Sequence, residues 1–419
     1  MRVLRLLLLL AVVLLLQGAY SMTILWTKSY AHTNPYPIDF SIAVCPRGVI
    51  VLAPSAASDV LSLFNVTSGA ILWTFNRTKE IAGDGRVFTL PNESNRFFIH
   101  SDSGHTAFSI ETGQFLFSLQ GMKNYGVGIL ALSLSGKVLF TSDVDYVYSF
   151  NALTGTRNWA YYVQDFPGDD VESNVAAATC EKDDGTLVDC ALLISAASVD
   201  DNLGSEVLAV AENAPLFRNL IHEDLSSNND LSYAQQGDLL LVSTFYGTFA
   251  TSVKEGRIVW NVSALAPPTL LSNDLFIATS QNNREIFITS AATGAILQSY
   301  TAECSAAPAI IDRTTGILVV QLKCPHHNSE SVVVLRGVNI STGAAIWSVH
   351  SSCGHVTVGP VLNSASVAVF GTSCGLSAVN TLNGNLISSL ETSKVVRMSL
   401  VSPNVVVVEI DSTIQAVQF

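Results

Sequence analysis

A nine-residue segment that recurs along the chain restricts the possible folds more than any other feature. It reads Asn-Val-Thr-Ser-Gly-Ala-Ile-Leu-Trp at residues 65–73 and Asn-Ile-Ser-Thr-Gly-Ala-Ala-Ile-Trp at residues 339–347. Looser copies occupy residues 151–159, 291–298 and 381–388. Each tryptophan of the protein ends such a unit: Trp26, Trp73, Trp159, Trp260 and Trp347. Self-similarity of this kind is typical of a repeat architecture.

Each copy has the composition of a β-hairpin. Thr/Ser-Gly predicts a tight turn in which glycine adopts a positive φ, and a β-prone run follows that ends on a large aromatic residue. The ring buries a large apolar area, and its N–H needs a hydrogen-bond acceptor. Because one hairpin is only marginally stable, the units must stack, and each ring is expected to fill a socket on a neighbouring unit.

Positions equivalent to the aromatic are 38 to 58 residues apart, which leaves room for four short strands per unit. They are Trp73, Phe117, Trp159, Phe217, Trp260, Gln298, Trp347 and Ser388. We predict that Trp26, Trp73, Phe117, Trp159, Trp260 and Trp347 dock one unit onto the next. The unit that ends near Phe217 is the least regular, because its turn at residues 211–215 lacks glycine.

The two chain ends complement each other. The strand at residues 23–26 ends on Trp26 but has no unit before it, and the strand-like runs at 395–400, 405–410 and 413–419 have no aromatic strand after them. We therefore expect the N-terminal strand to complete the last unit, which is how a β-propeller protects its sheet edges. Direct counting gives nine units.

The N-terminus reads as a secretory signal peptide. Arg2 and Arg5 precede an apolar run at residues 6–16, and Ala19-Tyr20-Ser21 is a small-residue cleavage site. An uncleaved anchor is the alternative, but the apolar run is much shorter than the roughly 20 residues that span a bilayer. We expect residues 1–21 to be removed, and a mature chain with no membrane span in the secretory lumen or outside the cell.

Sequons and cysteines agree with a secretory route. Five asparagines precede X-Ser/Thr and are predicted glycosylation sites: Asn65, Asn76, Asn92, Asn261 and Asn339. An unmodified turn asparagine is the alternative for each. From their positions around strand pairs we predict the disulfides Cys180–Cys190, Cys304–Cys324 and Cys353–Cys374, and a free Cys45. No cysteine pair has the Cys-x-x-Cys spacing of a zinc or redox site.

The composition excludes some partners. The formal charge of −13 becomes −15 when Arg2 and Arg5 leave with the signal peptide. Nucleic acids and anionic membranes need Lys/Arg patches, so neither is expected as a partner.

The Thr/Ser-Gly-x-x-x-Trp unit resembles the pyrroloquinoline-quinone (PQQ) repeat of quinoprotein alcohol dehydrogenase-like β-propellers. Trp73, Trp159 and Trp347 match with the turn intact, and Trp260 matches without the threonine. The resemblance covers residues 22–419 and implies one all-β domain. It also implies eight blades, the commoner number for this motif, against nine by direct count. The superfamily includes quinone-dependent dehydrogenases and non-catalytic scaffolds.

The residues favour a scaffold over an enzyme. Many of the dehydrogenases hold the quinone against a disulfide between adjacent cysteines, and no two cysteines are adjacent here. The acidic segments 165–172 and 198–202 contain possible calcium ligands but lack the ligand spacing of a known calcium loop. His326-His327 beside Cys324 lacks a second cluster with metal-ligand spacing. No dinucleotide fingerprint or phosphate-binding loop is present.

We therefore predict a secreted or lumenal, non-catalytic propeller without a cofactor. It would bind a protein or glycan partner through loops on a rigid scaffold. The irregular loops at residues 165–174 and 181–189 are the predicted contact surface. A PQQ- and calcium-dependent oxidoreductase and a folding or sorting factor of the secretory pathway are the alternatives.

Overall fold

A computed structural model describes most of the chain. The described residues are 22–29, 41–53, 58–78, 86–90, 93–101, 104–119, 130–133, 135–143, 146–163, 173–182, 184–199, 202–221, 232–236, 238–244, 247–263, 269–272, 275–280, 282–324, 332–351, 356–410 and 413–419. They form strands and turns and contain no helix. Accordingly, no helix in these ranges is long and apolar enough to cross a membrane.

The described strands form nine antiparallel sheets of four strands, which we call blades. The chain divides into two compact units, and the larger one covers residues 32–65 and 70–302. Its six blades are β2–β5 (Ser41–Cys45, Gly48–Ala53, Ser58–Phe64, Ile71–Thr78), β6–β9 (Arg86–Phe88, Arg96–Ser101, Gly104–Ser109, Phe115–Ser118), β10–β13 (Ala131–Leu132, Val138–Ser142, Tyr146–Asn151, Arg157–Tyr162), β14–β17 (Ser173–Glu181, Leu187–Val199, Asn202–Ala211, Ala214–Ile221), β18–β21 (Ser232–Gln236, Leu239–Thr244, Gly247–Ser252, Arg257–Ser263) and β22–β25 (Thr269–Ser272, Leu275–Thr279, Glu285–Ser290, Ile296–Thr301).

The smaller unit holds the other three blades and covers residues 1–31, 66–69 and 303–419. Two blades are again continuous in the sequence, and the third takes its fourth strand from the N-terminus. The strands are β26–β29 (Ser305–Asp312, Ile317–Lys323, Val332–Asn339, Ala345–Ser351), β30–β33 (Val356–Leu362, Val367–Thr372, Gly375–Asn380, Leu386–Glu391) and β34–β36 with β1 (Val395–Ser402, Val405–Ile410, Thr413–Gln418, Thr23–Ser29).

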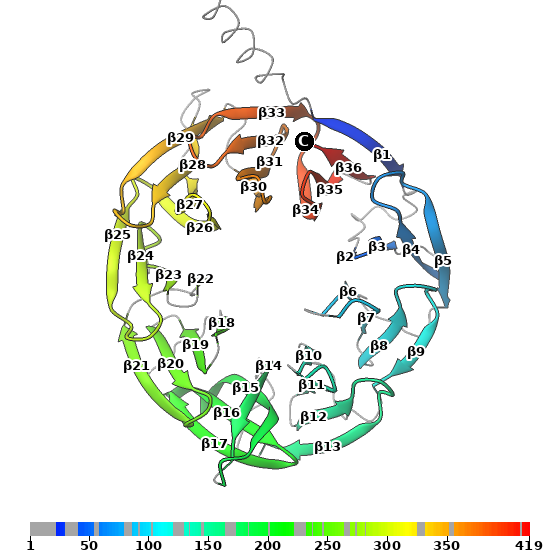
Figure 1. The fold of residues 1–419 in the computed structure, drawn as a ribbon, viewed down its shortest axis with the longest axis vertical. Helices are drawn as coiled ribbons and strands as arrows, with labels where there is room; N and C mark the ends of the chain where they lie inside the picture. The colour runs from blue at the N-terminus through cyan, green and yellow to red at the C-terminus, as the bar shows by residue number, and fades with distance from the viewer. Residues whose placement is uncertain are drawn as a thin grey trace, which may run out of the picture. The chain divides into compact units, whose positions relative to one another are not determined.

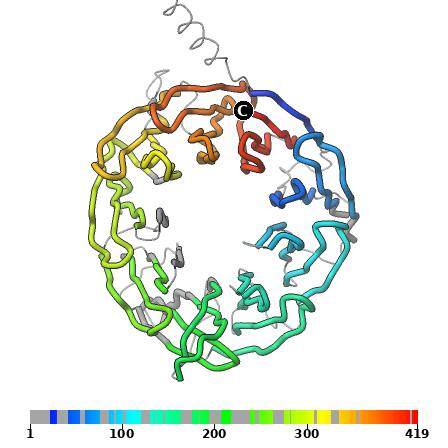
Figure 2. The backbone as a smooth tube through the Cα atoms, viewed as in Figure 1, coloured from blue at the N-terminus to red at the C-terminus, as the bar shows by residue number. Residues whose placement is uncertain are grey.

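The N-terminal strand closes the last blade, as the sequence predicts. β1 pairs antiparallel with β36 from Thr23 opposite Gln418 to Ser29 opposite Thr413. Figure 1 shows the blue strand β1 beside the red strand β36, and the tube in Figure 2 shows the same two segments side by side. Met22, the first described residue, is buried with Val406 and Val417 in the core of this unit.

The strands in the middle of a blade account for the continuous apolar runs in the sequence. All six residues of β3 are buried, and so are all six of β35. A strand covered on both faces reads as a continuous apolar run, whereas the outermost strands are largely exposed. Core clusters lie between successive blades: Ile50, Leu61 and Leu63 of one blade pack with Phe97, Ile99 and Phe108 of the next.

The blade count corrects one expectation. The preference for eight blades, which came from the commonness of that number, is wrong for this chain. The described residues form nine four-stranded sheets, in agreement with the direct count. The irregular unit near Phe217 is a full blade whose second strand, β15, has 13 residues, so its longer strands account for the widest gap between aromatic positions.

A β-bulge recurs in all nine blades and was not predicted. Between the third and fourth strands the register shifts by one residue just before the aromatic position. In the first blade, for example, Trp73 lies opposite Leu63 and Ile71 opposite Phe64, so Leu72 is the extra residue. A bulge bends its strand and re-aims the next side chain. The repeated bulge therefore turns each ring out of its own sheet.

Candidate functional site

Four tryptophans dock in the same way on a turn of a neighbouring hairpin. The Nε1 of Trp73 donates to the carbonyl of Ile110 at 2.9 Å, and that of Trp260 donates to the carbonyl of Ala291 at 2.9 Å. Trp347 donates to Thr381 and Trp26 to Val66, both at 2.6 Å. In every case the acceptor is the third residue before the turn glycine. The indole N–H thus finds the partner that its burial requires.

The glycine of each turn makes room for the ring. A Cβ built on Gly113 would lie 2.7 Å from the ring of Trp73, and one on Gly384 would lie 2.7 Å from Trp347. Both glycines have φ +70°, a conformation that other residues avoid. The Thr/Ser-Gly sequence therefore serves two purposes, since glycine permits the turn and leaves space for the aromatic face.

A small residue on the adjacent strand supports most of these rings. Seven of the nine residues opposite the aromatic position are Ala, Gly or Ser, and in the eight blades that are continuous in sequence all but one stand ten positions before it. A Cβ on Gly337 would lie 2.1 Å from the ring of Trp347. The ten-residue spacing is visible in the sequence, so these supporting residues were predictable but were not predicted.

Phe117 occupies the same kind of socket without an N–H to donate. A Cβ on Gly155 would lie 2.3 Å from its ring, so the packing is retained. The carbonyl three residues before this glycine belongs to Ala152, and it accepts a hydrogen bond from Nη1 of Arg96. Arg96 also donates through Nε to Glu93 at 2.8 Å. The side chains of Arg96 and Glu93 are only 12% and 8% exposed. Arginine here replaces the donor that phenylalanine lacks.

The irregular blade, β14–β17, lacks the turn glycine on which Trp159 would pack. Its third and fourth strands are joined by Glu212 and Asn213, which have φ 49° and 66°, in a two-residue turn without glycine. Trp159 is half-buried and packs 6.0 Å from Phe140, between ring centroids. Phe217 of this blade faces a glycine in the usual way, since a Cβ on Gly256 would lie 2.7 Å from its side chain. Among the predicted docking residues, Trp159 is thus the one that does not pack on a turn glycine.

The cysteines lie largely where the sequence places them. Disulfides join Cys180 to Cys190 and Cys304 to Cys324, with Cα–Cα distances of 5.8 and 5.1 Å. Cys374 is also disulfide-bonded, and its predicted partner Cys353 lies outside the described residues. Cys45 is free and buried, and burial raises the pKa of its thiol, against the lowering effect of hydrogen bonding with the backbone of Arg47 and Gly48.

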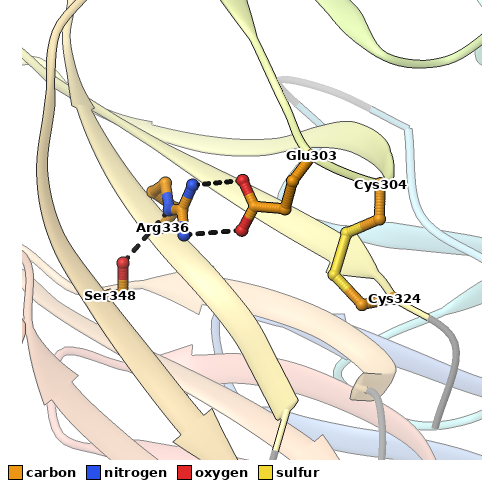
Figure 3. Close-up of a disulfide and its surroundings, with 5 residues drawn as sticks. All are labelled: Glu303, Cys304, Cys324, Arg336 and Ser348. Atoms are coloured by element: carbon orange, nitrogen blue, oxygen red, sulfur yellow. Dashed lines mark hydrogen bonds and ion pairs between the residues drawn. A yellow bond between two sulfur atoms is a disulfide. The ribbon is translucent and has the colours of Figure 1, made fainter. Parts of the chain in front are cut away.

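An ion pair between Arg336 and Glu303 lies beside the second disulfide (Figure 3). Arg336 on β28 holds both carboxylate oxygens of Glu303, at 2.5 and 2.7 Å, and its Nε donates to the hydroxyl of Ser348 at 3.1 Å. Partial burial alone would raise the pKa of Glu303, but the hydrogen bond and charge of Arg336 lower it overall. Bidentate pairs of this kind fix geometry as well as charge. Ser348 is thereby held in one orientation.

Ser348 is one of the residues that line a groove of about 760 Å³ in the smaller unit. The groove lies between β29, which supplies Ser348 and His350, and β33, which supplies Ser389 and Glu391. Phe370 and Leu376 line it too, and both are almost completely buried. Its volume is within the roughly 300–1,000 Å³ range of ligand pockets. This groove is the candidate binding site, and no motif in the sequence indicated it.

Three charged side chains of the acidic loop at residues 181–189 pair with side chains outside the loop. Lys254 lies 2.8 Å from Glu181, Lys182 lies 2.5 Å from Glu212, and Ser135 donates to Asp189 at 2.5 Å. The hydrogen bond and charge of Glu181 raise the pKa of Lys254. No group of three His, Cys, Asp or Glu that could hold a metal occurs among the described residues. The segment 165–172 and His326-His327 lie outside them.

One sequon asparagine has a structural role. The side-chain oxygen of Asn339 accepts hydrogen bonds from the backbone of Ser341 at 2.9 Å and of Thr342 at 3.2 Å. Asn151, which is in no sequon, caps its own turn in the same way. Turn capping therefore explains why asparagine recurs at this position, whether or not it is glycosylated. Asn261 is exposed on β21, Asn76 is on β5, and Asn92 is outside the described residues.

A family model described as outer membrane protein assembly factor BamB matches residues 56–300 and 234–418. The chain belongs to this family. No curated protein sequence matches the chain. BamB from Moraxella catarrhalis has 14% identity and a TM-score of 0.50, over 95% of this chain and 100% of that one.

Two further solved structures have the same fold. The dihydro-heme d1 dehydrogenase NirN in complex with DHE has 11% identity and a TM-score of 0.51, over 90% of this chain and 79% of that one. A eukaryotic initiation factor has 10% identity and a TM-score of 0.59, over 88% and 90%. This member of the BamB family is thus an all-β, PQQ-like β-propeller, with nine blades in its described residues. Identities this low support the fold alone.

In this BamB-family chain a buried carboxylate adds a second connection at one socket. Thr381, whose carbonyl accepts from Trp347, donates through its hydroxyl to Asp312 at the end of β26. Thr314 donates to the same carboxylate through its backbone at 3.0 Å and its hydroxyl at 2.6 Å. Burial alone would raise the pKa of Asp312, but these hydrogen bonds, with those of Ser366 and Thr315, hold it well below its usual range. The ionised carboxylate therefore stabilises two neighbouring blades.

We predict that Gly113→Ala destabilises the protein more than Gly136→Ala. Both glycines have nearly the same φ, +70° and +71°, but a Cβ on Gly136 meets nothing within 4 Å. Both variants carry the backbone cost of about 1–2 kcal/mol, and Gly113→Ala must also displace Trp73, at a further ~1–3 kcal/mol. Urea unfolding measures the difference, and equal losses would contradict the ring-socket explanation.

Arg96→Met should lower the free energy of unfolding by about 3–5 kcal/mol, because it leaves the buried carboxylate of Glu93 without a cationic partner. The control is Arg47→Met, since Arg47 pairs with Glu111 at 3.8 Å with both side chains more than half exposed. That loss should stay below about 1 kcal/mol. Chemical denaturation of both variants tests this, and comparable small effects would show that Arg96 does not replace the missing donor.

Asp312→Asn should destabilise the protein at neutral pH by about 1–3 kcal/mol, the usual contribution of hydrogen bonds to a charged group. Because the folded-state pKa is lowered, the stabilisation is present above the unfolded value of about 3.9 and is lost as the pH falls below it. The difference between wild type and variant should therefore shrink between pH 6 and the most acidic pH at which both remain folded, which circular dichroism follows. A constant difference would assign the effect to packing.

Proposed function

We propose that this chain is a non-catalytic scaffold of the secretory route that binds a protein partner. The observation that carries the proposal is a set of exposed apolar pairs on the outermost strands of the larger unit. They lie immediately after the turns, and each residue is between 38% and 57% exposed: Ile71 and Leu72, Phe115 and Leu116, Ile258 and Val259, Ile296 and Leu297.

Apolar side chains scattered singly over a surface are ordinary, but paired ones that recur on strand edges are not. β5, β9, β21 and β25 are each bonded to a neighbour on one side only (Figure 1). A free edge with exposed apolar side chains offers both main-chain hydrogen bonds and apolar contacts to another polypeptide. This combination favours a protein over a glycan as the partner.

Two features support an extracytoplasmic location. Disulfides persist in oxidising compartments, and two are fully described here, with Cys374 in a third bond. The N-terminal sequence has the features of a cleaved signal peptide. The BamB relatives are described as assembly factors, so an assembly or folding role among secretory proteins fits the proposal.

Processing of the full chain in a eukaryotic secretory system tests the location. We expect the mature protein to begin at Met22 and to gain mobility on removal of N-linked glycans, with Asn261→Gln abolishing part of the shift. N-terminal sequencing and gel mobility give the result. A chain that keeps residues 1–21 and carries no glycan would contradict the proposed route.

Site-specific photo-crosslinking tests the partner. A photoreactive phenylalanine analogue placed at Leu116 should give discrete protein adducts in secretory cells, and the same probe at exposed Lys137 should not. The captured protein, once purified, should bind the wild-type chain directly and bind a Leu116→Lys variant more weakly. Identical adducts from both positions, or none from Leu116, would contradict the proposal.

Thermal unfolding separates the scaffold from an oxidoreductase. We expect the melting temperature of the mature chain to be the same with and without PQQ and calcium. Because a ligand that binds only the native state raises the melting temperature, a saturable rise would overturn the non-catalytic assignment.

A further inference from the structure

We propose that the groove between β29 and β33 binds an extended peptide segment that carries a positively charged side chain. This inference rests on the proposed function, because it gives the scaffold a partner class and a place to bind it. The groove belongs entirely to the smaller unit and is separate from the exposed apolar pairs of the larger one.

The strands on both sides of the groove favour an extended ligand. β29 and β33 are the outermost strands of their sheets, and each is paired on one side only, with β28 and β32. A strand edge of this kind bonds the backbone of an added strand. β33 has six residues, so a segment of about six residues, roughly 20 Å long, matches its length.

Two serine side chains line the groove. Ser377 on β32 lies opposite Ser389 on β33, and both line the space. In two other blades the equivalent hydroxyl pairs bond each other, Ser62 with Thr74 and Thr106 with Ser118, each at 3.2 Å. No such bond joins Ser377 and Ser389 among the described contacts, which leaves these hydroxyls for a ligand.

Ser348 lies at the margin of the groove and bonds to the opposite face of its sheet. Its oxygen accepts the hydrogen bond from Arg336, whose guanidinium is fixed by Glu303 beside the Cys304–Cys324 disulfide (Figure 3). Its neighbour Trp347 packs on Gly384 of the β30–β33 blade, and side chains alternate along a strand, so Ser348 points away from that blade. The hydroxyl donors for a peptide carbonyl are therefore Ser377 and Ser389.

The charge of the groove favours a positively charged ligand. Among the described residues that line the groove, Glu391 is the one carboxylate and is exposed, and none is Lys or Arg; His350 is the other titratable side chain. Arg336 nearby is neutralised by Glu303. Within the described part of the chain no ion pair involves Glu391. A lysine or arginine on the peptide supplies the complementary charge.

Fluorescence anisotropy with two labelled hexapeptides tests the proposal. One is Val-Thr-Lys-Val-Ser-Val, and the other has Glu in place of Lys. We expect saturable binding of the lysine peptide to the mature wild-type chain below about 1 mM, and about three- to fivefold weaker binding of the glutamate peptide, the range for one exposed ion pair. Glu391→Lys should reverse this preference.

Two variants separate the groove from the rest of the surface. Ser389→Tyr fills the groove and should abolish binding, whereas Thr74→Tyr, at the equivalent position on β5, should leave it unchanged. Circular dichroism verifies that both variants are folded. No saturable binding of the lysine peptide, or equal binding by both variants, would overturn the inference. Photo-crosslinks from Leu116 would stand in either case, so failure here is distinguishable from failure of the proposed function.

Discussion

The contact between an aromatic ring and a glycine turn is the interaction on which the rest of the structure depends. Each blade is a four-stranded meander, and such a repeat cannot bury its apolar faces alone. The ring of one blade packs over the glycine of a neighbouring turn and, when it is tryptophan, donates to the carbonyl three residues earlier. Hydrophobic burial and one directed hydrogen bond thus fix both the distance and the orientation of neighbouring hairpins.

The junctions that depart from this pattern show how much of it is required. Phe117 keeps the packing and loses the donor, and the donor is supplied by Arg96 from another strand. Trp159 keeps the ring but faces a hairpin with no glycine. Thr381 gains a second connection through the carboxylate of Asp312. Packing of a large side chain is common to all of these junctions, whereas the groups that complete the hydrogen bonding differ.

Much of this fold could be predicted from the sequence because the repeat is local. The turn, the aromatic strand and the closure by residues 23–26 each follow from short segments, and the count of nine came from their spacing. The preference for eight blades failed because it relied on the frequency of an architecture instead of on the units present. Two disulfides were predictable because each joins neighbouring strands of one blade.

The remaining features depend on contacts between segments far apart in the chain. Arg96 and Ala152 are 56 residues apart, and Asp312 and Thr381 are 69 apart, so no local pattern relates them. The bulge is a property of strand register, which the sequence of one strand does not reveal. The groove exists because several serines happen to face the same space, and serine alone carries no signal for a site. Candidate binding surfaces therefore had to come from the structure.

The closing strand also sets the order of events during synthesis. β1 is among the first segments to leave the ribosome, but its partner β36 ends at residue 418. At ~5–20 residues per second the N-terminal strand waits for about 20–80 s before its partner exists. During that interval Trp26 and its exposed neighbour Ile24 have no sheet to join. The last blade is thus completed only once β36 has been made, and a chaperone that holds the nascent β1 segment would protect the strand on which completion depends.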